Sequence, residues 1–155
     1  MALKSDRYEL QTDISFFCNT ALDRGVLVAH GATAGSGGGM DQGVNLVATS
    51  TSATPLGILL NDVVDKDLTR THLNQHKDEV QKGGKVTVLR KGYVVTDKVD
   101  NPGGVSAGDT AYQSADVAGN IASSGTVAVG NFLGSADADN YLKVEVNLPS
   151  FNQAS

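Results

Sequence analysis

The stretch Tyr141-Leu142-Lys143-Val144-Glu145-Val146-Asn147-Leu148 carries the strongest structural signal in the chain. Its four aliphatic side chains alternate with Tyr, Lys, Glu and Asn, so the two sets point to opposite faces. This alternation predicts a half-buried strand of an antiparallel sheet with one face in water. Pro149 follows directly and is expected to end the strand, because proline lacks the amide hydrogen that a sheet ladder needs.

Two other runs predict strands nearer the centre of the fold. Leu56-Gly57-Ile58-Leu59-Leu60 is apolar on both faces, which is typical of a central strand. The run from Lys85 to Thr96 is longer, with Val86 and Val88 facing inward. Gly92 in its middle predicts a bulge or a bend, since glycine inside a strand often marks one.

Shorter runs and glycine-rich turns complete the pattern. Further strands are expected at 13–18, 26–29, 45–48 and 126–133. In the first of these, Ile14, Phe16 and Cys18 are expected on one face, with Cys18 a small core residue. Many short strands separated by turns predict a mainly β protein, a small β-barrel or sandwich with one short helix or extended arm and a flexible N-terminal arm.

The predicted organisation is one domain with arms. We expect an N-terminal arm at 1–10, a single β-rich domain at 11–149 and a C-terminal tail at 150–155. Within the domain, 31–43 is predicted to be a flexible loop because it is rich in glycine. An insertion at 65–84 contains good helix formers between Asp67 and Val80 but few apolar residues, so it is either a short helix or an extended arm.

Composition excludes several classes of protein. At 155 residues the chain fits one domain, and with aromatic residues at 5% and no Trp its core must come from Val, Leu and Ala. The apolar runs are far shorter than the roughly 20 residues of a membrane span, so no membrane partner is expected. One cysteine cannot form an internal disulfide, and the opening residues show no signal-peptide core. These features fit a reducing cytoplasm.

Charge is distributed unevenly along the chain. The net charge of −5 argues against a protein that coats nucleic acid. Residues 66–98 nevertheless hold eight basic and four acidic residues, against four basic and thirteen acidic elsewhere. A basic middle on an acidic body indicates either a surface that meets an acidic partner or simply a solvated face.

The motifs that could carry chemistry do not assemble into a catalytic site. Gly104-Val105-Ser106-Ala107-Gly108 matches the Gly-x-Ser-x-Gly nucleophile elbow, but Pro and Gly around it oppose the required strand and helix. His72 and His76 would share a helix face, yet two imidazoles do not fill a zinc shell. We therefore expect no enzyme activity, no metal and no cofactor.

Two groups of segments resemble known phage proteins. The opening Met1 to Phe17 and the stretch from Leu60 to Thr87, with its His-Lys-Asp-Glu-Val-Gln-Lys-Gly-Gly-Lys-Val-Thr ending, are similar to small virion proteins of tailed bacteriophages, notably those of cyanobacteria. The series Pro-Leu-Gly-Ile, Gly-Tyr-Val-Val, Ala-Gly-Asp-Thr-Ala-Tyr and Val-Gly-Asn-Phe-Leu, at 55, 92, 107 and 129, resembles the wider phage head-decoration family.

This resemblance implies a capsid cement or decoration protein. Its expected partners are the major capsid protein and itself, as a homotrimer, with no nucleic acid. Its expected location is the outer capsid surface of the virion, after assembly in the host cytoplasm. A head–tail joining or tail component, or a virion protein that binds the host surface, is the alternative. The candidate capsid or subunit contacts are Arg7, Tyr8, Lys82, Lys85, Arg90 and Lys91.

Overall fold

The computed structural model of the chain describes residues 3–18, 20–30, 46–65 and 79–148. Its strands are β1 (Tyr8–Cys18), β2 (Leu27–His30), β3 (Leu46–Ala48), β4 (Pro55–Leu59), β5 (Asp62–Val64), β6 (Glu79–Gln81), β7 (Lys85–Thr96), β8 (Thr110–Gln113), β9 (Ile121–Ala122), β10 (Ala128–Phe132) and β11 (Leu142–Asn147). A 3-10 turn at Pro102–Gly104 is the one helical segment within these ranges. The mainly β prediction is confirmed.

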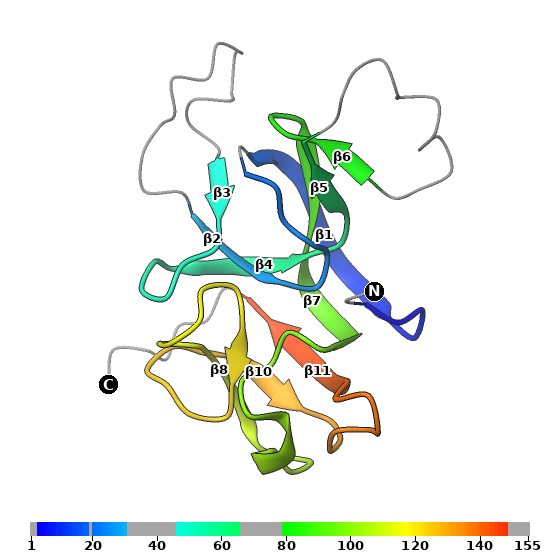
Figure 1. Cartoon of the computed structure of the whole chain (residues 1–155), viewed down its shortest axis with the longest axis vertical. Helices are drawn as coiled ribbons and strands as arrows, with labels where there is room; N and C mark the ends of the chain where they lie inside the picture. Colours follow the sequence, from blue (N-terminus) through cyan, green and yellow to red (C-terminus); the bar gives the residue numbers. More distant parts are fainter. Residues whose placement is uncertain (1–2, 19, 31–45, 66–78, 149–155) are drawn as a thin grey trace.

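Nine strands form one sheet that folds back on itself. The order is β1-β3-β2-β4-β7-β11-β10-β8-β9, and β1 also pairs with β7. The second β1 pairing closes a ring through β3, β2, β4 and β7, and the remaining strands extend from β7. In Figure 1 the ring strands lie in the upper half and β8, β10 and β11 in the lower half. Strands β5 and β6 form a separate parallel pair.

The aliphatic side chains form two cores that share a wall. Leu27 and Ile58 belong to the core of the lower half, whereas their neighbours Val28 and Leu59 belong to the core inside the ring. All five residues of β4 are buried. The prediction that this apolar run is a central strand is therefore confirmed, because each of its faces packs against a different core.

Strand β7 supports three other strands. Along one edge it pairs with β1 from Lys85 to Tyr93, and along the other it pairs first with β4 and then with β11. These contacts are close: a Cβ added at Gly57 of β4 would lie 2.2 Å from the carbonyl oxygen of Leu89. Gly92 has φ +138°, and a Cβ there would lie 1.9 Å from the carbonyl oxygen of Tyr8. The irregularity predicted at Gly92 is present, and it lies where β1 crosses β7.

The N-terminal segment is part of the sheet, which corrects the arm expected at 1–10. Strand β1 begins at Tyr8, and Leu3 bridges to Thr96. The Lys4 amide donates to the carbonyl oxygen of Val95, 3.0 Å away. Leu3 is 2% exposed, within the lower core. The arm has a partner because β7 extends beyond β1 and leaves an edge that residues 3 and 4 fill.

One further expectation differs from the structure. Ile14 does not share the buried face of Phe16 and Cys18: it is 63% exposed, because the pairing with β7 shifts between Asp13 and Phe16. Cys18 itself is fully buried, as predicted. Glu79–Gln81, near the end of the insertion expected to be either a short helix or an extended arm, forms strand β6. Short strands at β5, β8 and β9 were not predicted.

Several predictions fall on residues outside the described ranges. They concern the glycine-rich loop at 31–43, the histidines His72 and His76, most of the insertion at 65–84 and the tail at 150–155.

Replacement of Gly92 by alanine is expected to lower the free energy of unfolding by about 3 kcal/mol, because the new methyl group would overlap the β1 backbone at a positive φ. Urea denaturation followed by circular dichroism measures the change. Gly103→Ala is the matched control, since an added Cβ there meets no atom within 4 Å. Equal stability of the two variants would contradict this account of the strand crossing.

Candidate functional site

The six candidate contact residues lie on or directly before one pair of strands. Arg7 and Tyr8 stand at the start of β1, Lys82 lies in the turn before β7, and the other three are on β7. Lys85 is opposite Phe17 and Lys91 opposite Gln11, near the other end of β1. At about 3.3 Å per residue, the two lysines are roughly 20 Å apart along the strand. The structure therefore spreads the candidates along one strand pair, and it buries Arg90 Nε.

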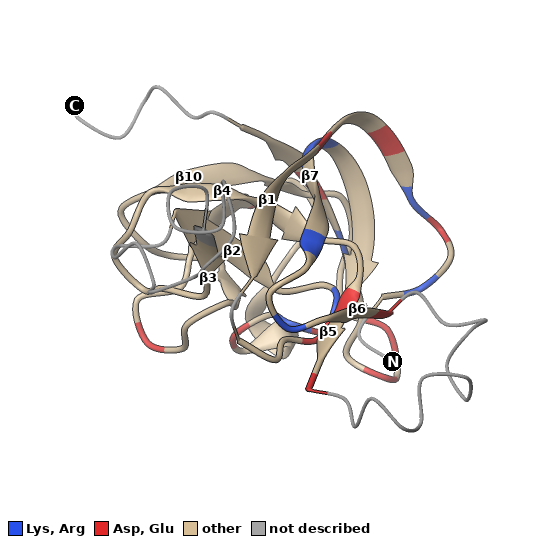
Figure 2. Cartoon of the chain, turned by 90° about the horizontal axis from the view of Figure 1, so that it is seen from above, with Lys and Arg blue, Asp and Glu red and all other residues tan. Residues whose placement is uncertain are grey.

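The basic side chains of this surface differ in their surroundings. Arg7 Nε lies 2.9 Å from Glu9 Oε1, and Lys85 Nζ lies 5.7 Å from the centre of the Phe17 ring. Lys82 is exposed, whereas Arg90 and Lys91 are half-buried. Figure 2 shows basic and acidic positions side by side on this part of the molecule. The surface is thus mixed in charge rather than uniformly basic.

Strand β1 also presents apolar side chains to solvent. Tyr8 is 54% exposed, Leu10 65% and Ile14 63%, so three of the five large apolar side chains exposed in the described part of the chain lie on one strand. Sequence reasoning included Tyr8 but missed Leu10 and Ile14. Leu10 was assigned to an arm and Ile14 to a buried face, and no local pattern reveals the bulge that exposes it. Exposed apolar side chains grouped in this way are typical of protein contact surfaces.

The outer edge of β1 is largely open within the described residues, and it is irregular. On this edge β1 pairs with β3 at Phe17 and Cys18. The pairing of β1 with β7 shifts register at three places. Bulges of this kind make a strand edge a poor template for another regular strand. A partner is therefore expected to contact the side chains of β1 more than its backbone.

The bulge at Asp13 is held by its own side chain. Both the amide and the hydroxyl of Ser15 donate to Asp13 Oδ1. These bonds, and to a lesser extent the charge of Arg90, hold the pKa of Asp13 below its usual value. The lowered pKa favours the ionised carboxylate in the fold, and its bonds to Ser15 hold the backbone on both sides of Ile14.

Next to β1, the outer face of β7 and β11 carries tyrosine rings with lysines beside them. The rings of Tyr8 and Tyr93 stack with centres 6.1 Å apart, and Lys143 Nζ lies 3.9 Å from the centre of the Tyr93 ring. Lys4 Nζ lies 4.6 Å from the Tyr141 ring and 2.7 Å from Asp137 Oδ2. Its hydrogen bond to Asp137 raises the pKa of Lys4 and lowers that of the carboxyl.

A shallow hollow lies where β1 crosses β7. Its volume is about 320 Å³, and its lining residues are Tyr8, Leu10, Lys91, Gly92, Tyr93, Glu145, Val146 and Asn147. Gly92 leaves room because it has no side chain. Aromatic and aliphatic groups surrounded by one cation, one anion and an amide give the composition of a protein contact site with a polar rim.

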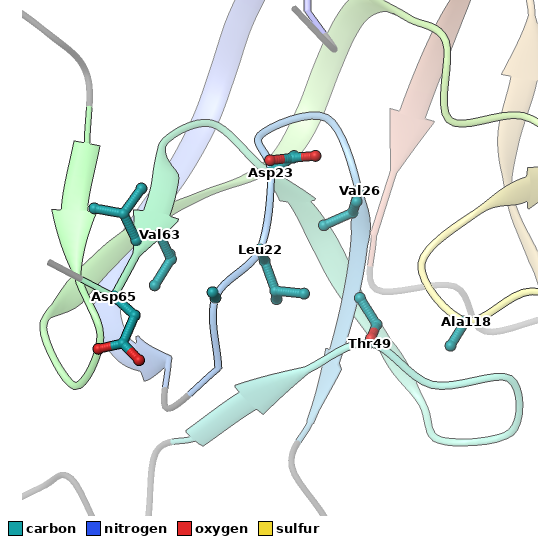
Figure 3. A pocket seen from close by; sticks show the side chains of 9 residues that line it. Leu22, Asp23, Val26, Thr49, Val63, Asp65 and Ala118 are labelled. Atoms are coloured by element: carbon teal, nitrogen blue, oxygen red, sulfur yellow. The ribbon is translucent and has the colours of Figure 1, made fainter.

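A second hollow, of about 420 Å³, lies between β5 and the segment that precedes β2 (Figure 3). Its lining residues are Ala21, Leu22, Asp23, Val26, Thr49, Val63, Val64, Asp65 and Ala118. We call it the acidic hollow, since its charged lining residues are Asp23 and Asp65. The amide of Leu22 donates to the carbonyl oxygen of Val63, and the amide of Val63 donates to the carbonyl oxygen of Leu22. These two bonds fix the segment after β1 against β5.

The Gly-x-Ser-x-Gly match lies in a turn. The amide of Ser106 donates to Asp109 Oδ2 at 2.8 Å, and Gly108 has φ +93°. The turn follows the 3-10 segment and leads into β8, so neither the strand nor the helix of a nucleophile elbow flanks it. Within the described ranges, no three His, Cys, Asp or Glu side chains are grouped to hold a metal ion. No helix found there is long and apolar enough to cross a membrane.

The comparison with protein families identifies the chain. Among curated proteins, none matches it significantly. A family model described as "Structural cement protein (E217 gp24/Pam3 gp6)" matches residues 5–147. The match includes β1, β7 and all six candidate contact residues, and it confirms the resemblance found in the sequence. The chain therefore belongs to the phage structural cement proteins, which stabilise the capsid.

Proposed function

We propose that this cement protein binds the outer surface of the capsid shell and contacts the major capsid protein through the surface of β1 and β7. The observation that carries the proposal is the row of exposed apolar side chains on β1 beside the basic side chains of β7. Both lie within the family match. A protein that acts by adhesion needs such a surface and no reaction centre.

The two kinds of side chain have different tasks in this proposal. Tyr8, Leu10 and Ile14 lose exposed apolar area on binding, which supplies the favourable free energy. Lys82, Lys85, Arg90 and Lys91 meet acidic groups of the capsid protein. Charges at the rim of an interface mainly set the association rate and its salt dependence rather than the affinity.

The protein acts as a homotrimer in this proposal. Closed symmetry is the common solution for a chain with open strand edges and exposed apolar groups. Three copies of one contact surface also bind a symmetric shell with avidity, so each contact can be weak. Neither nucleic acid nor a membrane is a partner, and the protein enters the particle during assembly in the host cytoplasm.

No catalysis is part of this proposal. Ser106 lies in a turn whose backbone is bonded to Asp109, which gives the hydroxyl no elbow geometry. The family is structural. No cofactor is needed for adhesion.

Density for this chain is expected on the outer face of the capsid, as trimers, in an electron-microscopy map of the particle. Cement proteins of this kind occupy hundreds of sites, whereas a head–tail joining ring holds about a dozen copies. A map that places the chain at a single vertex would contradict the proposed location. A map that shows separate monomers would contradict the trimer.

The double variant Lys82→Glu/Lys85→Glu is expected to bind shells that lack the protein about tenfold more slowly at low salt, and with less dependence on salt. Surface plasmon resonance on immobilised shells measures both. The control is Lys82→Arg/Lys85→Arg, which keeps both positive charges at the same positions and should bind as the wild type does. Thermal unfolding of both variants checks the fold. Unchanged association of the first variant would overturn the electrostatic part of the proposal.

Ser106→Ala is expected to change neither the unfolding temperature nor capsid binding, because the bond to Asp109 comes from the backbone amide. A fluorophosphonate probe should leave the wild-type protein unlabelled. Labelling of the wild type that is lost in Ser106→Ala would show a reactive serine and would contradict a purely structural role.

A further inference from the structure

Ile14 is exposed at a place where a regular strand would turn it toward a core. Alternate residues of a strand share a face, so regular alternation puts Ile14 on the face of Phe16. Phe16 lies opposite Val86 and packs on the core inside the ring. Opposite Val88, which belongs to the same core, lies Asp13. A carboxylate therefore has the register position that regular alternation would give to the isoleucine.

One extra residue of β1 causes this exchange. Ile14 and Ser15 lie between the two paired positions, where β7 has Thr87 alone, and this is the arrangement of a bulge. Asp13 Oδ1 accepts the Ser15 amide at 2.8 Å and also the Ser15 hydroxyl. Hydrogen bonds to a carboxylate are stronger than those between neutral groups. They oppose the hydrophobic gain that burial of Ile14 in the regular register would bring.

We propose that Asp13 is a positioning residue for capsid binding, which holds Ile14 outward as a side chain that contacts the shell. This inference rests on the proposed function. Ile14 is 63% exposed, so the bulge leaves in water an apolar surface that the regular register would remove. Contact with a partner removes that surface from water instead, together with those of Tyr8 and Leu10 on the same strand.

The first measurement needs no capsid. The chain has three isoleucines, and Ile58 and Ile121 are fully buried. In a methyl NMR spectrum of the intact chain, a soluble gadolinium chelate should therefore broaden the signal of Ile14 and spare the other two. In Asp13→Ala this broadening should be largely lost, because the bulge loses both hydrogen bonds.

Asp13→Asn is the matched control. It removes the same charge as Asp13→Ala but keeps a side-chain oxygen that can accept both bonds from Ser15. The Ile14 methyl group should therefore stay as exposed as in the wild type. Ser15→Ala, which loses the hydroxyl bond alone, should give broadening between that of the wild type and that of Asp13→Ala.

The second measurement is the affinity of the intact chain for phage shells that lack it. Ile14→Ala and Asp13→Ala should each weaken binding about tenfold, and Asp13→Asn should not. Because Asp13 acts through Ile14 in this proposal, Asp13→Ala/Ile14→Ala should bind no more weakly than Ile14→Ala. Independent roles of the two residues would make the two losses multiply.

The outcomes separate this inference from the proposed function. An Ile14 methyl group that stays equally exposed in Asp13→Ala, normal binding of Ile14→Ala, or losses that multiply in the double variant would each overturn the inference. Broadening of the Ile58 signal in Asp13→Ala would also overturn it, since Asp13 would then support the whole fold. Failure of the wild type to bind shells would overturn the proposed function, whatever the methyl spectra show.

Discussion

Everything in this fold depends on how closely three strands approach β7. Its backbone pairs with β1 along one edge and with β4 and then β11 along the other. The approach is possible because Gly57 and Gly92 have no side chains at the points of contact. This pairing leaves the other edge of β1 largely open within the described residues, and the exposed side chains of β1 belong to the surface that we propose binds the capsid. Stability and the proposed capsid binding therefore depend on the same few backbone contacts.

The surface proposed to bind the capsid, and the acidic hollow, are built from irregular parts of an otherwise regular sheet. Bulges in β1 turn Ile14 outward and discourage the addition of another strand. The acidic hollow lies where a loop after β1 meets β5 and the β8–β9 loop. The regular strands supply the rigid frame, and the exposed apolar and acidic side chains lie where the sheet is irregular. This division suits a protein that must bind many identical sites without polymerising by itself.

The strands that were predicted correctly are those whose buried side chains can be recognised from the residue types alone. Leu142 to Leu148, Leu56 to Leu60 and Lys85 to Thr96 were all predicted as strands, because each shows its buried face directly in its composition. Sequence reasoning failed at Ile14, at Leu3 and at the short strands β5, β8 and β9. The environments of these residues are set by distant segments: Leu3 is buried by β7, and Ile14 is exposed by a register shift against it. The acidic hollow could not be predicted, since four separate parts of the chain line it.

The shared wall between the two cores has an evolutionary consequence. Adjacent residues of β2 and β4 project into different cores, so a change of volume at Ile58 shifts the backbone that also positions Leu59. The effect of a substitution in one core therefore depends on the residues of the other core. A second substitution in the other core can compensate for it. Exposed positions such as Leu10 lie outside this constraint. The surface proposed to bind the capsid can therefore change without repacking either core.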